Sequence, residues 1–184
     1  KTMSLSSQIH AFYHLMNSFV FIAILLASLL SIPIMFIRSR FDEPVIVDLL
    51  GTLFISSLVI LGIYYYTAFR RVKPSHGIGQ FLMTYLLFLS SSMGMSFHNA
   101  KAVLEAYVGI QSAFIRTPKF NVDLPNQWKS NRYISQIGSF ELSIEIALSI
   151  IFCAAVIYGV FQGEYAFVFF HLLLSAGFGI LAFT

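Results

Sequence analysis

The chain has 184 residues, of which 58% are hydrophobic and only 10% are charged, with a formal net charge of +3. This composition excludes an ordinary soluble domain and is typical of a membrane protein. The expected partner is therefore the lipid bilayer, not a nucleic acid. The single cysteine, Cys153, lies in a hydrophobic run and excludes an internal disulfide.

Four hydrophobic runs have about the length of a membrane-spanning helix, which needs ~20 apolar residues. They cover residues 15–37, 46–69, 140–161 and 166–183. We therefore expect an all-α membrane protein, with residues 1–184 forming a single transmembrane domain. The chain starts at Lys1 without a methionine and stops at Thr184, directly after a hydrophobic run. We expect it to be a fragment of a larger protein.

Two histidines near the start, His10 and His14, lie four residues apart and hence on one helical face. A His-x-x-x-His pair suits the histidine boxes of membrane di-iron enzymes, but those enzymes need many more histidines than the five present here. We expect the two side chains to lie at the interface, against lipid headgroups or a soluble domain. No metal site is expected in this chain.

The second hydrophobic run ends in three tyrosines at positions 64–66, followed by Arg70, Arg71 and Lys73. Aromatic residues at the end of a span followed by bases indicate the cytoplasmic interface. The segment 99–139 carries five bases against two acids and is also expected to be cytoplasmic. If the intervening residues crossed the membrane, one of these basic connections would lie outside.

The intervening run therefore predicts a helix that does not cross. Polar residues recur at helical spacing along residues 79–107, at Gln80, Thr84, Ser91, His98 and Glu105. We expect an interfacial or re-entrant amphipathic helix there. The alternative is a chain with five spans.

Two glutamates, Glu141 and Glu145, lie four apart at the start of the third run. They can pair with a lysine or arginine of the loop 109–139 or line a polar passage; alternatively, carboxylates simply suit the first turns of a helix. We favour the last interpretation for Glu141 and leave Glu145 open. His171 is expected to be hydrogen-bonded inside the helix bundle, and small residues such as Gly177 predict close helix contacts.

The segment 109–139 contains a short basic stretch with the pattern Phe114-x-x-Thr117-x-Lys119. This pattern resembles the gating-loop motif, Phe-x-Val-Thr-x-Lys, of the bacterial cellulose synthase catalytic subunit and other membrane-embedded family 2 glycosyltransferases. Residues 10–17, 95–105 and 116–121 look like the bacterial cellulose-synthase-like branch. The order of spans, basic turn, interface helix and loop is also similar. Arg116 stands where the cellulose synthase motif has valine.

The resemblance implies the membrane-channel and gating-loop portion of a processive or glycolipid-forming glycosyltransferase, which transfers sugar from a nucleotide-diphosphate sugar. Phe114, Arg116, Thr117 and Lys119 would then contact the substrate, the two bases through charge-assisted hydrogen bonds to the diphosphate. The family's acidic motifs, catalytic aspartate and Gln-x-x-Arg-Trp signature do not occur in the sequence. No catalytic residue is therefore expected here.

By the same resemblance, the partner of this chain is a cytoplasmic glycosyltransferase domain of the same polypeptide, and the divalent metal belongs to that domain. The protein is then expected in a bacterial inner membrane with the loop on the cytoplasmic side. The sequence leaves a non-enzymatic alternative open, in which Arg116 and Lys119 lie among lipid headgroups. Such a module would be a small transporter or a lipid-binding scaffold. A metal-dependent lipid oxidase using His10, His14 and His98 is a further alternative.

Overall fold

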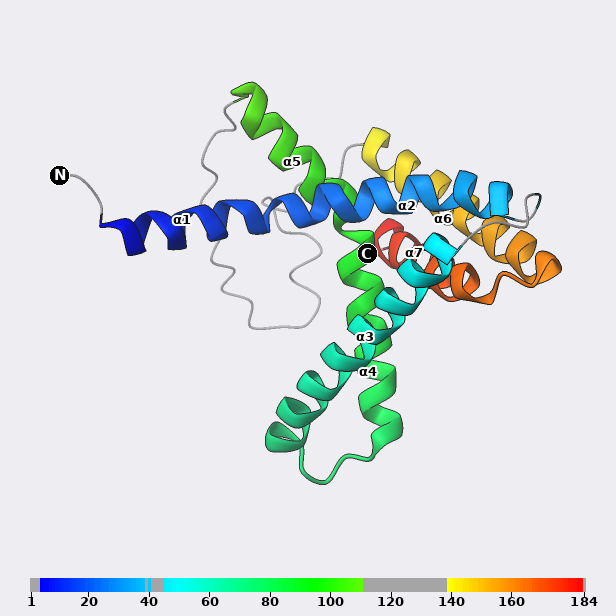
Figure 1. Ribbon diagram of the computed structural model, residues 1–184, viewed down its shortest axis with the longest axis horizontal. Coiled ribbons are helices and arrows are strands. Elements are labelled where there is room, and N and C mark those ends of the chain that lie inside the picture. The colour runs from blue at the N-terminus through cyan, green and yellow to red at the C-terminus, as the bar shows by residue number, and fades with distance from the viewer. Residues whose placement is uncertain (1–3, 39, 41–44, 111–138, 184) are drawn as a thin grey trace, which may run out of the picture.

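The computed structural model describes residues 4–38, 40, 45–110 and 139–183. All regular secondary structure in these residues is α-helical, which confirms the predicted fold class. The helices are α1 (Leu5–Asn17), α2 (Phe19–Arg38), α3 (Val45–Val72), α4 (Ile78–Gly94), α5 (Ser96–Val108), α6 (Ser139–Gln162) and α7 (Tyr165–Ala182) (Figure 1).

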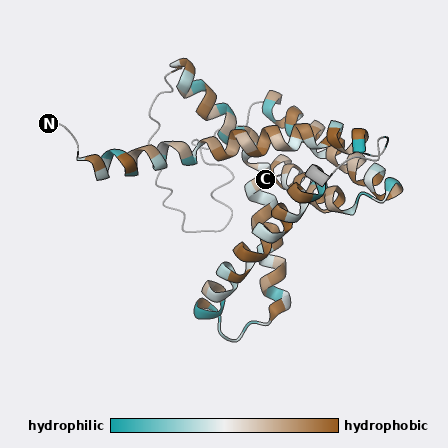
Figure 2. Cartoon of the chain, viewed as in Figure 1, coloured by the Kyte–Doolittle hydropathy of each residue, from teal (hydrophilic) through white to brown (hydrophobic). Residues whose placement is uncertain are grey.

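Five helical stretches of the described residues are long and apolar enough to cross a membrane, as judged by length and composition. They are Leu5–Arg38, Asp48–Val72, Ile78–Val108, Phe140–Gln162 and Tyr165–Ala182. Four of them contain all or nearly all of the predicted spans, and Figure 2 shows that hydrophobic residues dominate α2, α6 and α7. The remaining stretch, Ile78–Val108, is the helix expected at the interface. It is interrupted at Met95, which separates α4 from α5.

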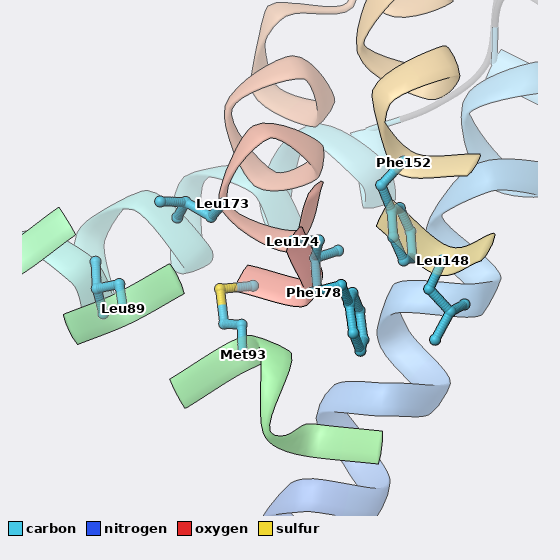
Figure 3. Packing of buried hydrophobic residues seen from close by; sticks show 7 residues of the cluster. All are labelled: Leu89, Met93, Leu148, Phe152, Leu173, Leu174 and Phe178. Carbon is cyan, nitrogen blue, oxygen red and sulfur yellow. The ribbon is translucent and has the colours of Figure 1, made fainter. Parts of the chain in front are cut away.

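The core lies where α4 meets the α6–α7 hairpin. Seven buried side chains form it, namely Leu89, Met93, Leu148, Phe152, Leu173, Leu174 and Phe178 (Figure 3). The rings of Phe152 and Phe178 stack with their centroids 5.9 Å apart. These side chains from three helices fix the position of α4 across α7.

Two glycines allow the backbones of α4 and α7 to approach closely. A Cβ added to Gly94 would overlap the backbone of Gly177, and one added to Gly177 would overlap the backbone of Ser90. This contact confirms the prediction that small residues in the last span allow close helix packing, the usual solution in a membrane where apolar side chains gain little by associating.

An ion-pair cluster joins two turns that are far apart in the sequence. Arg38, at the end of α2, lies 2.8 Å from Asp48 and 3.0 Å from Glu164, which precedes α7. The end of α2, the start of α3 and the α6–α7 turn therefore lie at the same end of the bundle. Figure 1 shows α4 running across the direction of α2, α6 and α7.

This shared end bears on the number of crossings. Between Arg38 and Glu164 the described chain contains α3, the α4–α5 stretch and α6. Two turns on one face of a membrane must be separated by an even number of crossings. If α3 and α6 each cross once, the α4–α5 stretch does not cross. The ion pair therefore favours the interfacial or re-entrant placement over five spans.

Candidate functional site

The residues predicted to contact substrate, Phe114, Arg116, Thr117 and Lys119, lie outside the described residues. The structure describes the helices on either side of them. Helix α5 ends at Val108 and is followed by Gly109, whose φ of 81° closes the helix in the left-handed conformation that glycine adopts readily. Helix α6 begins at Ser139. The candidate site is therefore built from the contacts between α5 and α6.

A lysine of α5 joins the two helices near the start of α6. The Nζ atom of Lys101 donates a hydrogen bond to Oε1 of Glu141 at 2.6 Å and lies 3.8 Å from Glu105, one turn further along α5. Glu141 also occupies the first turn of α6, where a carboxylate suits the helix dipole. The interpretation favoured for Glu141, a carboxylate in the first turn of a helix, fits its position, and its partner is Lys101 of α5 and not a base of the loop.

A second polar pair lies one turn deeper. Nε2 of His98 is 2.5 Å from Oε1 of Glu145, whose side chain is 0% exposed, whereas that of His98 is 38% exposed. The sequence left open whether Glu145 has a polar partner, and the structure gives it one on α5. Because a buried carboxylate without a partner is costly, this contact favours the observed position of α5 relative to α6, while the backbone of α5 packs mainly against α2.

The described residues use only part of the hydrogen-bonding capacity of the Glu145 carboxyl group. Its second oxygen, Oε2, is buried and has no hydrogen-bond partner among them, and the same is true of the buried hydroxyl of Ser96. Leaving a buried polar atom unpaired costs ~1–3 kcal/mol. Glu145 and Ser96 therefore retain the capacity to accept or donate one more hydrogen bond each.

Further polar contacts follow the α6–α7 hairpin. The hydroxyls of Ser149 and Ser175 each donate to the other's carbonyl oxygen at 3.0 Å. Oγ of Ser31 lies 2.8 Å from Nε2 of the fully buried His171, which matches the expected hydrogen-bonded histidine inside the bundle. The buried ring of Phe152 packs against His171, so these contacts are separate steps along the described helices, not a continuous polar passage.

The histidines do not gather into a metal site in the described part of the chain. No group of three or more His, Cys, Asp or Glu side chains there has the arrangement needed to hold an ion. His10 and His14 are exposed on α1, and His98 is engaged with Glu145. This geometry gives the lipid-oxidase alternative no support.

Sequence reasoning singled out His98, Glu141 and Glu145 but neither Lys101 as a partner nor the pairing itself. His98, Lys101 and Glu105 follow one face of α5, and Glu141 and Glu145 follow one face of α6. This spacing predicts two polar stripes. The positive charge of Lys101 on one stripe and the glutamates on the other were the signal that could have suggested a contact between them. Which stripe faces which depends on how the helices pack.

The chain was compared with known protein families, with curated protein sequences and with solved structures, and no match was found in any of the three.

Proposed function

We propose that this chain is the membrane-embedded, loop-bearing portion of a processive or glycolipid-forming family 2 glycosyltransferase. Catalysis would take place in a cytoplasmic domain outside this chain, which would also hold the divalent metal. The basis is the resemblance of Phe114-x-x-Thr117-x-Lys119 to the gating-loop motif of that family. The donor class is a nucleotide-diphosphate sugar.

The structural observation that carries the proposal is the hydrogen bond between Lys101 and Glu141, 2.6 Å long. It connects the helix before the motif to the helix after it, and the His98–Glu145 contact repeats the connection one turn deeper. Functional loops are typically held by a rigid scaffold at their two ends. The α5–α6 pairs link the two helices that flank the segment containing the motif, and the packing of α5 against α2 supports such a role.

The residues of the motif suit a diphosphate ligand. Arg116 presents a planar group that can bind two phosphate oxygens, and Lys119 adds a compact positive charge. Thr117 supplies a neutral hydroxyl, and Phe114 an apolar anchor. In this proposal the loop closes over the donor, and its bases neutralise charge on the diphosphate.

The test uses the longer protein that includes the upstream cytoplasmic domain, reconstituted in lipid and supplied with a panel of nucleotide sugars. Lys119→Ala should lower turnover about tenfold or more, because a hydrogen bond to a charged group contributes ~1.5–3 kcal/mol. Thr117→Ala should lower it by a smaller factor. Arg40→Ala, in the exposed turn at the opposite end of the bundle, is the matched control and should leave turnover unchanged.

The second candidate is a non-enzymatic helical membrane module, either a small transporter or a lipid-binding scaffold. The buried hydrogen bond of His171 and the partly buried one of Ser149 are the observation in its favour, because polar groups inside a membrane are costly and are often kept for a function, even where they form no continuous passage. Wild-type turnover in both loop variants, or no transfer from any nucleotide sugar, would select this candidate.

A further inference from the structure

An apolar groove runs along the contact between α3 and α4. It extends from Ile55 to Tyr66 on α3 and from Ile78 to Leu89 on α4, and the start of α7 also lines it, from Tyr165 to Phe169. Its volume is about 770 Å³, within the range of ~300–1,000 Å³ that is typical of ligand sites. Tyrosine hydroxyls are the only polar side-chain groups among the described residues that line it.

The dimensions of the groove suit one hydrocarbon chain. At ~1.5 Å per residue, the α3 wall from Ile55 to Tyr66 is about 16 Å long. The acyl chains of one leaflet cover about half of a ~30 Å hydrocarbon core, or ~15 Å. The hydroxyl of Tyr85 donates to the carbonyl oxygen of Leu58 at 2.7 Å, so the protein itself satisfies this polar group within the wall.

Positive charge lies at the open end of this groove. Val59, Gly62, Tyr66 and Arg70 follow one face of α3, so Arg70 continues the groove wall by one turn. Its Nη1 atom donates to the carbonyl oxygen of His76 at 3.3 Å, which places the guanidinium over the α3–α4 turn. The sequence contains no Asp or Glu between Asp48 and Glu105, so neither helix supplies a neutralising acid near this turn.

The start of α4 adds to the same positive field. Helix α4 begins after Gly77 without a side-chain hydrogen bond to cap it, and its first residue, Ile78, lines the groove. The first N–H groups of a helix have no partner within the helix, and the helix dipole there favours an anion. A negatively charged headgroup at this end would meet both Arg70 and these N–H groups.

We propose that the groove binds one acyl chain of an anionic glycerophospholipid, with the phosphate headgroup at Arg70 beside the start of α4. The hydrocarbon wall alone would accept any lipid. Charge complementarity at Arg70 selects the anionic one. The site is built from α3, α4 and α7, so it does not depend on the proposed transferase function or on the residues of the loop motif.

The first arm of the test removes charge. The purified chain is titrated with phosphatidylglycerol and with phosphatidylcholine of the same acyl length, and bound lipid is counted by native mass spectrometry. Phosphatidylglycerol should bind more tightly to the wild type. Arg70→Gln should weaken that binding about fivefold, since one base near an anionic headgroup contributes ~1 kcal/mol. Arg71→Gln is the matched control, because Arg71 lies on the opposite side of α3 from Gly62.

The second arm fills the groove. Val59 and Ile63 line it and are 55% and 62% exposed, so Val59→Trp and Ile63→Trp should each occupy the chain site and reduce the binding of both lipids. Ile60→Trp is the control, since Ile60 is 69% exposed on the same helix but does not line the groove. Circular dichroism establishes that each variant keeps its helicity.

Equal affinity of the wild type for the two lipids would overturn the proposal, as would equal losses in Arg70→Gln and Arg71→Gln. Unchanged lipid binding in both groove-filling variants would do the same. A wild-type dimer that both groove-filling variants abolish would place a second copy of the chain in the groove and would also overturn it. If a tryptophan variant loses helicity, the comparison of lipid binding by Arg70→Gln and Arg71→Gln is sufficient to test the proposal.

Discussion

Nε2 of His98 on α5 lies 2.5 Å from Oε1 of Glu145 on α6, and the Glu145 side chain is fully buried. Together with Lys101 and Glu141, this pair connects the helices on either side of the segment that contains the loop motif. Losing either member of the pair leaves the other without its partner, and for Glu145 that partnerless group is fully buried.

His98→Ala should destabilise the protein by about 2 kcal/mol, because it leaves a buried carboxyl unpaired. The double variant His98→Leu/Glu145→Leu should recover part of that loss, since replacing both partners of a buried hydrogen bond by apolar side chains can be nearly neutral or stabilising. Unfolding in detergent, followed by circular dichroism, measures both effects. His10→Ala, which changes an exposed histidine of α1, is the control. A double variant less stable than His98→Ala would contradict the pairing.

The Lys101–Glu141 contact predicts rescue by charge exchange. Lys101→Glu and Glu141→Lys each place like charges opposite one another, whereas the double variant restores an ion pair with its direction reversed. If the proposed function holds, each single variant should lower sugar transfer by the longer protein that carries the catalytic domain, and the double variant should restore it. Additive losses in the double variant would show that α5 and α6 are not coupled through these two residues.

Gly177 should tolerate no side chain where α7 crosses α4. Gly177→Ala would bring a Cβ into the backbone of Ser90, and overpacking of this kind costs ~1–3 kcal/mol or more. Gly79→Ala is the matched control, because a Cβ at Gly79 meets nothing within 4 Å. Thermal unfolding in detergent should separate the two variants. Similar melting temperatures would mean that α4 and α7 do not approach as closely as the structure has it.

The Arg38–Glu164 ion pair predicts the sidedness of four exposed positions. With Cys153 replaced by alanine, single cysteines at Arg40 and Gln162 should react with a membrane-impermeant maleimide from one side of the membrane. Cysteines at Ser75 and Tyr107 should react from the other side. Reaction of the cysteines at positions 75 and 107 from opposite sides would show that the α4–α5 stretch crosses the membrane.

The spans and the fold class could be read directly from the sequence. Residues 15–37, 46–69, 140–161 and 166–183 lie almost entirely within α1–α2, α3, α6 and α7. The reason is physical: inside a bilayer every backbone N–H and C=O must be satisfied within the segment, and the thickness of the hydrocarbon core sets the length of the helix. Composition and run length therefore suffice for the helices themselves.

Only the tertiary structure decided which helix faces meet. Spacing along the chain places His98 and Lys101 on one face of α5, and Glu141 and Glu145 on one face of α6, but it does not say that these faces touch. The contacts Arg38–Glu164 and Gly94–Gly177 likewise join residues more than two helices apart in the sequence. A hydrophobic pattern fixes the periodicity of each helix, whereas the choice of neighbour depends on side-chain shape and polar pairing across the whole bundle.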